Sequence, residues 1–199
     1  MLSYLLRLDT VLFLFINDNF HFSILNENMR AATFLGNGWV VYWIVLVYTY
    51  IYNRLKFKES FYLLFLTQIT PGILDIAIKK IVNRPRPVVA LHNLIKAGEI
   101  HINLLGRHLT EDSFPSGHSV TAFSLAVALS YIFPKHKKLF YILAFIVAFS
   151  RVYDGEHYPL DVIAGGILGY FIAKLTLTAY KKIRKFKDFN FEKNNIKKA

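Results

Sequence analysis

Residues 138–173 read KLFYILAFIVAFSRVYDGEHYPLDVIAGGILGYFIA, which is two apolar runs joined by a short charged stretch. Neither run carries the polar face that a helix in a soluble bundle needs. Each is close to the ~17–25 residues that a membrane-spanning helix requires. The sequence therefore predicts two spans, at 138–153 and 159–179, with the charged stretch between them at the membrane surface.

Three more apolar windows of this kind occur earlier in the chain, at 38–53, 60–82 and 117–133. Residues 1–37 are apolar too, but Arg7 and Asp9 interrupt the run. This segment is predicted to be a helix lying in the membrane interface, with an imperfect sixth span as the alternative. The predicted fold is an all-α, polytopic membrane bundle of five to six transmembrane helices.

The composition narrows the possible classes of function. The 199 residues are 54% hydrophobic and include no cysteine, which excludes disulfides and thiolate metal sites. This length favours a single domain that comprises residues 1–199. Within it we expect the helix bundle at 38–180 and a basic tail at 181–199. The net charge of +11 suits an anionic partner. In a membrane bundle we expect that partner to be a lipid phosphate and not a nucleic acid.

The basic residues favour one side of the predicted bundle. They are concentrated at 54–58, at 135–138 and in the tail, and all three segments fall on the same face. The positive-inside rule makes that face cytoplasmic, which predicts a multi-pass protein of the inner (cytoplasmic) membrane with a cytoplasmic C-terminus. The opposite, extracytoplasmic face holds 83–116 and 150–158. Their charges cannot set the topology, so they indicate a functional site.

Two charged motifs lie at the two ends of the outer segment 83–116. In KKIVNRPRP, residues 79–87, the prolines are expected to end a helix and to hold Arg84 and Arg86 in extended backbone. FPSGHS, residues 114–119, precedes the next span. A helix N-terminus offers free N–H donors to an anion, and Gly117 lets the backbone approach a ligand closely.

The third motif is SRVYDGEHYPLD, residues 150–161. It supplies Arg151 at the end of one span and His157 just before the next. Pro159 suits a first helical turn. Asp161 is therefore predicted to lie one turn below His157 and to accept a hydrogen bond from its ring N–H.

Together the three motifs predict a phosphate-binding site. The candidate groups are the cations Lys79, Arg86 and Arg151, the Ser116 side chain, and the amides of Gly117 and His118. Such donors stabilise the charge that spreads over the oxygens of a phosphoryl group during transfer. Two histidines can divide the chemistry, because one can attack phosphorus while the other protonates the leaving oxygen.

The spacings K-x6-RP at 79–87, PSGH at 115–118 and SR-x5-H-x3-D at 150–161 resemble the three signatures of the type 2 phosphatidic acid phosphatase superfamily. The resemblance implies that His157 is the nucleophile, through a phosphohistidine, that Asp161 is its partner, and that His118 is the general acid. The residues it assigns to phosphate binding are Lys79, Arg86, Ser116, Gly117 and Arg151. It also implies chemistry without a metal or another cofactor.

The resemblance further implies an integral membrane lipid phosphatase that acts on a phosphate monoester or diphosphate. Undecaprenyl diphosphate and lipid A 1-phosphate are the favoured substrates, and phosphatidylglycerol phosphate is a third candidate. Two alternatives are a vanadium haloperoxidase-like enzyme and a non-catalytic lipid-binding or transport protein. The predicted spans disfavour the first, and the pair of histidines disfavours the second.

Other charged residues near the motifs have simpler interpretations. Asp75 lies one turn before Lys79 and is predicted to pair with Lys79 or Lys80. Arg84 is predicted to contact lipid headgroups at the membrane interface. Asp154 and Glu156 receive no assigned role.

The remaining features of these segments are predicted to be structural or to select the substrate. The long connection at 83–116 is expected to lie over the headgroup and to encode substrate choice. Its histidines, His92, His101 and His108, lack the local pattern of metal ligands. The glycines at 165, 166 and 169 are predicted to allow close helix packing.

Overall fold

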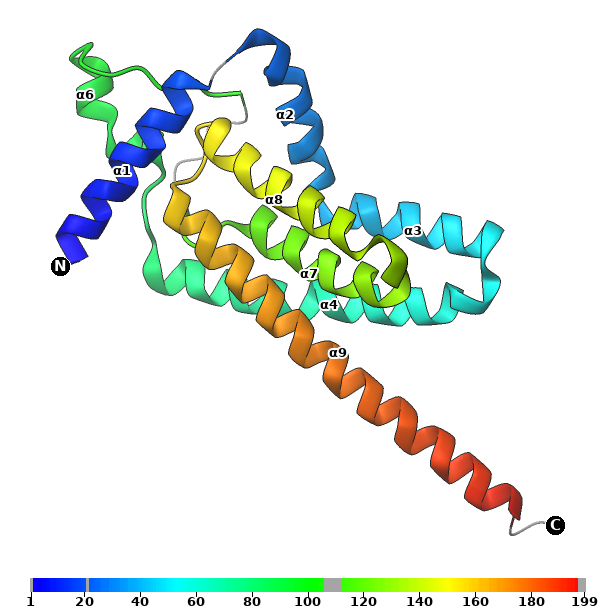
Figure 1. Cartoon of the computed structure of the whole chain (residues 1–199). Helices are drawn as coiled ribbons and strands as arrows, with labels where there is room; N and C mark the ends of the chain where they lie inside the picture. Colours follow the sequence, from blue (N-terminus) through cyan, green and yellow to red (C-terminus); the bar gives the residue numbers. More distant parts are fainter. Residues whose placement is uncertain (1, 21, 106–111, 197–199) are drawn as a thin grey trace.

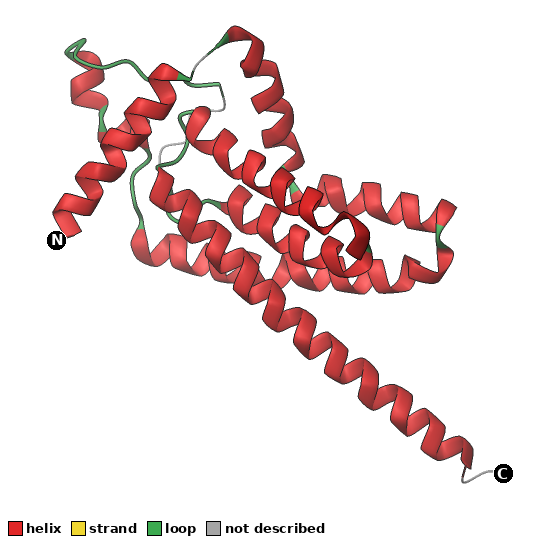
Figure 2. Ribbon diagram, in the orientation of Figure 1, coloured by secondary structure: helices red, strands yellow, loops and turns green. Residues whose placement is uncertain are grey.

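The computed structural model describes residues 2–20, 22–105 and 112–196, and this part of the chain contains helices and loops but no strand (Figures 1 and 2). The predicted all-α class is therefore confirmed for the described residues. The elements are α1 (Leu2–Asn19), α2 (Ser23–Leu35), α3 (Gly38–Tyr52), α4 (Arg54–Val82), α5 (Pro87–Ala90), α6 (His92–Lys96), α7 (Gly117–Ile132), the short 3₁₀ helix η1 (Pro134–His136), α8 (Lys137–Tyr153) and α9 (Pro159–Ile196).

Helix α7 is the centre of the bundle and packs against α4, α8 and α9 (Figure 1). Most of its residues are apolar, and its serines 119 and 124 are fully buried, so it presents no polar stripe to solvent. Small buried residues such as Ala122, Ala126 and Ala128 let its neighbours approach closely. Leu63 and Leu64 of α4 complete the core from one side.

The contact between α7 and α9 depends on glycines of α9, as predicted. A Cβ atom at Gly169 would lie 2.1 Å from the carbonyl oxygen of Val120, and one at Gly165 would lie 2.5 Å from that of Ser116. Both distances are far below van der Waals contact, and the obstructing atoms are backbone. Any side chain at these positions would therefore push the two helices apart.

We expect Gly169→Ala to lower the free energy of unfolding by about 1–3 kcal/mol, the usual cost of an overpacked interior. Thermal unfolding of the purified protein in detergent micelles measures this loss. Gly72→Ala is the matched control, because a Cβ at Gly72 of α4 meets no atom within 4 Å. Equal unfolding temperatures for the two variants would contradict the close α7–α9 contact.

Each of the five ranges predicted to span a membrane forms a helix, but the number of crossings is not confirmed. By length and composition, two stretches of the described chain can cross a membrane, Arg54–Lys96 and Pro159–Phe186. A third arises only if α2 and α3, bent by 73° at their junction, count as one broken span. Helices α7 and α8 have 16 and 17 residues. At 1.5 Å per residue they are shorter than a hydrocarbon core of roughly 30 Å.

The N-terminal segment forms two helices, whereas the sequence suggested one interfacial helix or an imperfect span. Helix α2 packs on α8. Helix α1 is joined to the end of α8 by Asn17, whose side-chain amide donates to the carbonyl of Tyr153 at 2.9 Å and to that of Asn103 at 3.0 Å. Helices α1 and α2 thus cover the end of the bundle where α4 and α8 stop and α7 and α9 begin, which we call the polar end.

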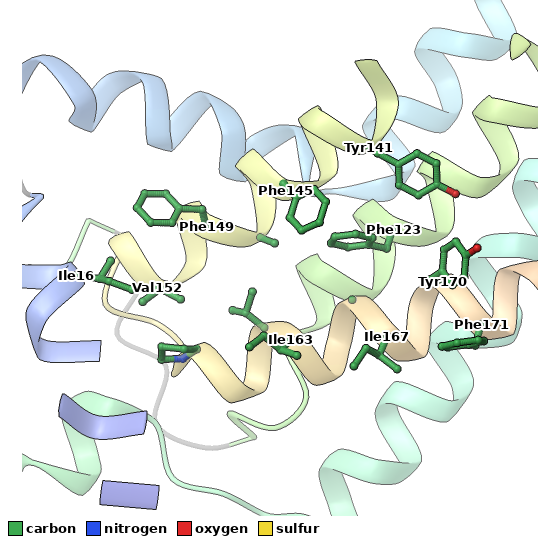
Figure 3. A pocket seen from close by; sticks show the side chains of 14 residues that line it. Ile16, Phe123, Tyr141, Phe145, Phe149, Val152, Ile163, Ile167, Tyr170 and Phe171 are labelled. Carbon is green, nitrogen blue, oxygen red and sulfur yellow. The ribbon is translucent and has the colours of Figure 1, made fainter. Parts of the chain in front are cut away.

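An apolar cavity of about 560 Å³ separates α8 from α9 (Figure 3). Phe145 and Phe149 of α8 and Ile163 and Ile167 of α9 line it, together with Phe123 of α7 (Figure 3). None of the predicted site residues lines this cavity. A surface of this composition suits contact with the hydrocarbon chains of lipids.

Candidate active site

The end of α4 directs two arginines across the polar end. Asn83 takes a left-handed conformation (φ 44°, ψ 46°) and terminates the helix. Arg86 follows in extended backbone (φ −71°, ψ 159°) before Pro87, as predicted. Asparagine tolerates the left-handed region better than most residues, so this sequence suits a sharp reversal between a helix and an extended segment.

Lys79, in the last turn of α4, is held by three acceptor atoms from two residues. Its ammonium donates to both carboxylate oxygens of Asp75, at 2.8 and 3.0 Å, and to the carbonyl of Pro115 at 2.7 Å. The predicted Asp75–Lys79 pair is therefore confirmed. A Cβ at Gly117 would lie 3.1 Å from the Asp75 carboxylate and 3.4 Å from the Lys79 ammonium, so glycine permits this close approach.

The start of α7 places Ser116 and His118 differently. Ser116 is fully buried, its amide donates to the carbonyl of Asp161 at 2.9 Å, and its hydroxyl accepts from Ser119 at 3.1 Å. His118 is half-buried and lines a cavity of about 430 Å³ between α3, α4 and α7. His118 shares this cavity with Asp75, the partner of Lys79.

Arg86 and Arg151 approach the same carboxylate, that of Glu156. Nη1 of Arg86 is 2.5 Å from Oε2 of Glu156, and Nη2 of Arg151 is 3.8 Å from the same oxygen. Nη1 of Arg151 donates to Asp154 and to Thr33 of α2, both at 3.2 Å. Its Nε is buried without a hydrogen-bond partner among the described residues, so Arg151 retains a donor for an anion.

His157 is buried, and its hydrogen bonds define its tautomer. Nδ1 lies 2.7 Å from the carbonyl oxygen of Ser113. Because a carbonyl can only accept, Nδ1 carries the proton and Nε2 keeps its lone pair. Nη1 of Arg86 is 3.4 Å from Nε2. The unprotonated nitrogen of His157 therefore faces Arg86, which the motifs predict to bind phosphate.

Asp161 lies below His157 but does not accept the predicted hydrogen bond, since Nδ1 is 3.8 Å from Oδ2. The carbonyl of Ser113 takes that proton instead. Asp161 accepts from the Ser113 hydroxyl at 2.6 Å and from the amide of Tyr158 at 3.0 Å. Ser113 therefore connects Asp161 to the imidazole, and Ser113 is a residue of the candidate site that the motifs did not reveal.

Arg84 does not lie at a lipid interface, and that prediction is wrong. Its side chain is only 16% exposed and is 2.5 Å from Oδ1 of Asp161 and 2.8 Å from Oδ2 of Asp9. Its guanidinium lies 4.0 Å above the ring of Tyr158. Asp9 in turn accepts from the amide of Leu160 at 2.9 Å. Helix α1 thus supplies a buried carboxylate that braces the arginine paired with Asp161.

The structure brings all eight predicted site residues to the polar end, where they lie around His157 and His118. Sequence reasoning missed Asp9, Thr33 and Ser113. Of these, only Asp9 gave a signal in the sequence, because it is an acid within the apolar run of α1. Within the described residues no group of three or more His, Asp or Glu side chains is arranged to hold a metal ion, and His108 lies outside them.

Comparison with known families matches residues 59–185 to the PAP2 superfamily. The chain is 33% identical over 119 residues to the lipid A 1-phosphatase of Rhizobium etli, covering 60% of this chain but only about half (50%) of that relative's length. It is 45% identical over 69 residues to the undecaprenyl-diphosphatase of Sulfolobus acidocaldarius, covering 34% of each chain. The crystal structure of Aquifex aeolicus LpxE superimposes with a TM-score of 0.68 at 31% identity, over 84% of this chain and 93% of that one.

Proposed function

This chain belongs to the PAP2 superfamily, and we propose that it is an integral membrane phosphatase that removes a phosphate from a lipid. The observation that carries the proposal is the arrangement at His157. Its Nδ1 proton is bound by Ser113, and its Nε2 lone pair faces Arg86 at 3.4 Å. A buried imidazole held in this tautomer beside cations is suited to attack on phosphorus.

In the proposed reaction, Nε2 of His157 attacks phosphorus and the bond from phosphorus to the lipid oxygen breaks. His118 donates a proton to that oxygen. Water then attacks the phosphohistidine, His118 takes the water's proton, and phosphate leaves as the N–P bond breaks. Lys79, Arg86, Arg151, Ser116 and Gly117 hold the phosphate oxygens during both steps. Asp161 keeps the imidazole oriented through Ser113 and stabilises its positive charge.

We propose undecaprenyl diphosphate or lipid A 1-phosphate as the favoured substrates, with phosphatidylglycerol phosphate as a third candidate. The names of two similar proteins support the first pair. The cavity of about 430 Å³ beside His118 is the place where the leaving lipid portion fits, because His118 is the proposed proton donor. We place the site on the extracytoplasmic face of the inner membrane and the C-terminus in the cytoplasm, since the basic segments favour that orientation.

The test is phosphate release by the purified protein from a panel of these three lipids in mixed micelles, with and without EDTA. The proposal requires release from at least one lipid, and EDTA should leave the rate unchanged. The absence of release from every lipid would overturn the enzymatic assignment. A loss of activity in EDTA that added divalent cations restore would overturn the metal-independent chemistry.

The pH dependence of kcat/KM should reveal the buried nucleophile. Burial, together with the charges of the nearby Arg86 and Arg151, lowers the pKa of His157 to about 4, although Asp161 opposes the shift. Only the neutral imidazole can attack, so the acid limb should fall near pH 4 and not near the usual value of about 6.5. An acid limb centred near 6.5 would contradict this environment for His157.

A further inference from the structure

Glu156 received no role from the motifs, yet its carboxylate lies between two of the proposed phosphate-binding arginines. Oε2 is 2.5 Å from Arg86 and 3.8 Å from Arg151. All three side chains are more than nine-tenths buried. Two guanidinium groups that are buried this close together repel each other, and the carboxylate between them offsets that repulsion.

The backbone presents Glu156 and His157 from one turn. The amides of both residues lie 3.2 Å from the carbonyl oxygen of Arg151. Gly155, with φ of 76°, makes the reversal that precedes them, and a Cβ there would lie 2.7 Å from the carbonyl oxygen of Asn103. The carboxylate is therefore placed on the arginines by the same loop that places the nucleophile.

A carboxylate and a phosphate compete for the same donors, because arginine binds both anions through its N–H groups. We propose that Glu156 is a resident anion on Arg86 and Arg151, and that the phosphate of the substrate must displace it. Glu156 then sets the affinity of the site for phosphate. This inference rests on the proposed function, since it takes these arginines to be the phosphate-binding cations.

The shifted pKa of Glu156 is consistent with its displacement from the two arginines by a phosphate. Burial raises the pKa of Glu156, and Arg151 and Arg86 oppose that rise. Its negative charge therefore depends on its contact with the two arginines. Once a phosphate takes them over, the carboxylate is expected to accept a proton, which avoids leaving an unpaired charge in the interior.

The functional consequence concerns release of the product. Inorganic phosphate makes the same contacts with the arginines as the substrate's phosphate, so a resident anion weakens both. Glu156→Gln keeps the shape of the side chain and removes its charge. We expect this variant to bind inorganic phosphate about tenfold more tightly, to lower KM for the lipid, and to show stronger product inhibition. If Glu156 only held Arg86 in place, the variant would bind phosphate more weakly, because the arginine could then move.

The experiment measures binding of inorganic phosphate to the full-length protein in detergent by the rise in unfolding temperature with phosphate concentration. Glu156→Ala, which removes the same charge, has to shift the affinity in the same direction as Glu156→Gln. The matched control is Glu27→Gln, which removes a charge from an exposed pair with Arg30 and should bind phosphate as wild type does.

Equal or weaker phosphate binding by both Glu156 variants would overturn the inference. Because binding is measured without turnover, the two proposals can fail separately. If the wild type releases phosphate from lipids but the variants bind no more tightly, only the role of Glu156 fails. If neither wild type nor variant binds phosphate, the assignment of the arginines fails, and the inference fails with it.

Discussion

Replacing His157 by alanine is expected to reduce phosphate release by a factor on the order of 10⁴ or more, since the proposed nucleophile is lost. Nε2 of His157 faces Arg86, and no other imidazole in the described chain is held in this way by Ser113 and Asp161. His118, the other histidine of the site, is already assigned to proton transfer. The measurement is kcat/KM for the preferred lipid of the panel.

Two further measurements distinguish lost chemistry from lost folding. The thermal unfolding of His157→Ala and His157→Gln should show that both remain folded, and His136→Ala, an exposed histidine in η1, should keep the wild-type rate. A radiolabelled phosphoenzyme, stable in base and labile in acid, should accumulate in wild type after rapid quenching. Its presence in the His157 variants, or wild-type activity in either, would exclude His157 as the nucleophile.

Replacing Arg84 by methionine is expected to destabilise the protein by about 3–5 kcal/mol, the usual cost of removing one partner from a buried ionic group. Arg84 lies between Asp9 and Asp161, whose side chains are fully buried. Without the arginine, both carboxylates remain in the interior and repel each other. The free energy of unfolding in detergent measures the loss, and activity should fall as well because Asp161 is no longer held.

A double variant isolates the cause of this loss. Asp9→Asn combined with Arg84→Met removes one of the stranded charges, so it should be more stable than Arg84→Met alone. Arg30→Met is the control, since the Arg30–Glu27 pair is mostly exposed and should contribute less than about 1 kcal/mol. If Arg84→Met unfolds as the wild type does, or if the Asp9 change adds to the loss, the buried pair has no such role.

The helices were largely predictable because each consists of an apolar run that ends at a recognisable signal. The predicted spans at 117–133 and 138–153 coincide with α7 and α8 to within a residue. The long helices were predicted less well, because hydropathy detects apolar windows and not helices that continue into polar sequence. Helix α4 begins at Arg54, inside the predicted basic connection, and α9 continues to Ile196 through most of the predicted tail.

The site was predictable where a motif is local and unpredictable where it depends on distant backbone. The position of Lys79, Arg86 and Arg151 at the polar end could be predicted, because each lies close to a proline or a helix end in the sequence. The Ser113 carbonyl could not, because which backbone oxygen reaches His157 depends on how a loop folds across the bundle. The prediction of a His157–Asp161 hydrogen bond was wrong for that reason. The one-turn spacing was right, but the sequence does not show that the Ser113 carbonyl competes as an acceptor.

The attachment of α1 has a consequence for how the protein is made. The hydrogen bond from the amide of Leu160 to Asp9 joins residues that are 151 positions apart. Contacts of such separation can form only after nearly the whole chain has been synthesised, because helices enter the membrane from the N-terminus onward. Helix α1 must therefore wait for α9 before Arg84 and Asp161 reach their final positions. On a ribosome-bound chain that lacks α9, the proposed phosphatase site would still be incomplete, because Asp161 belongs to that helix.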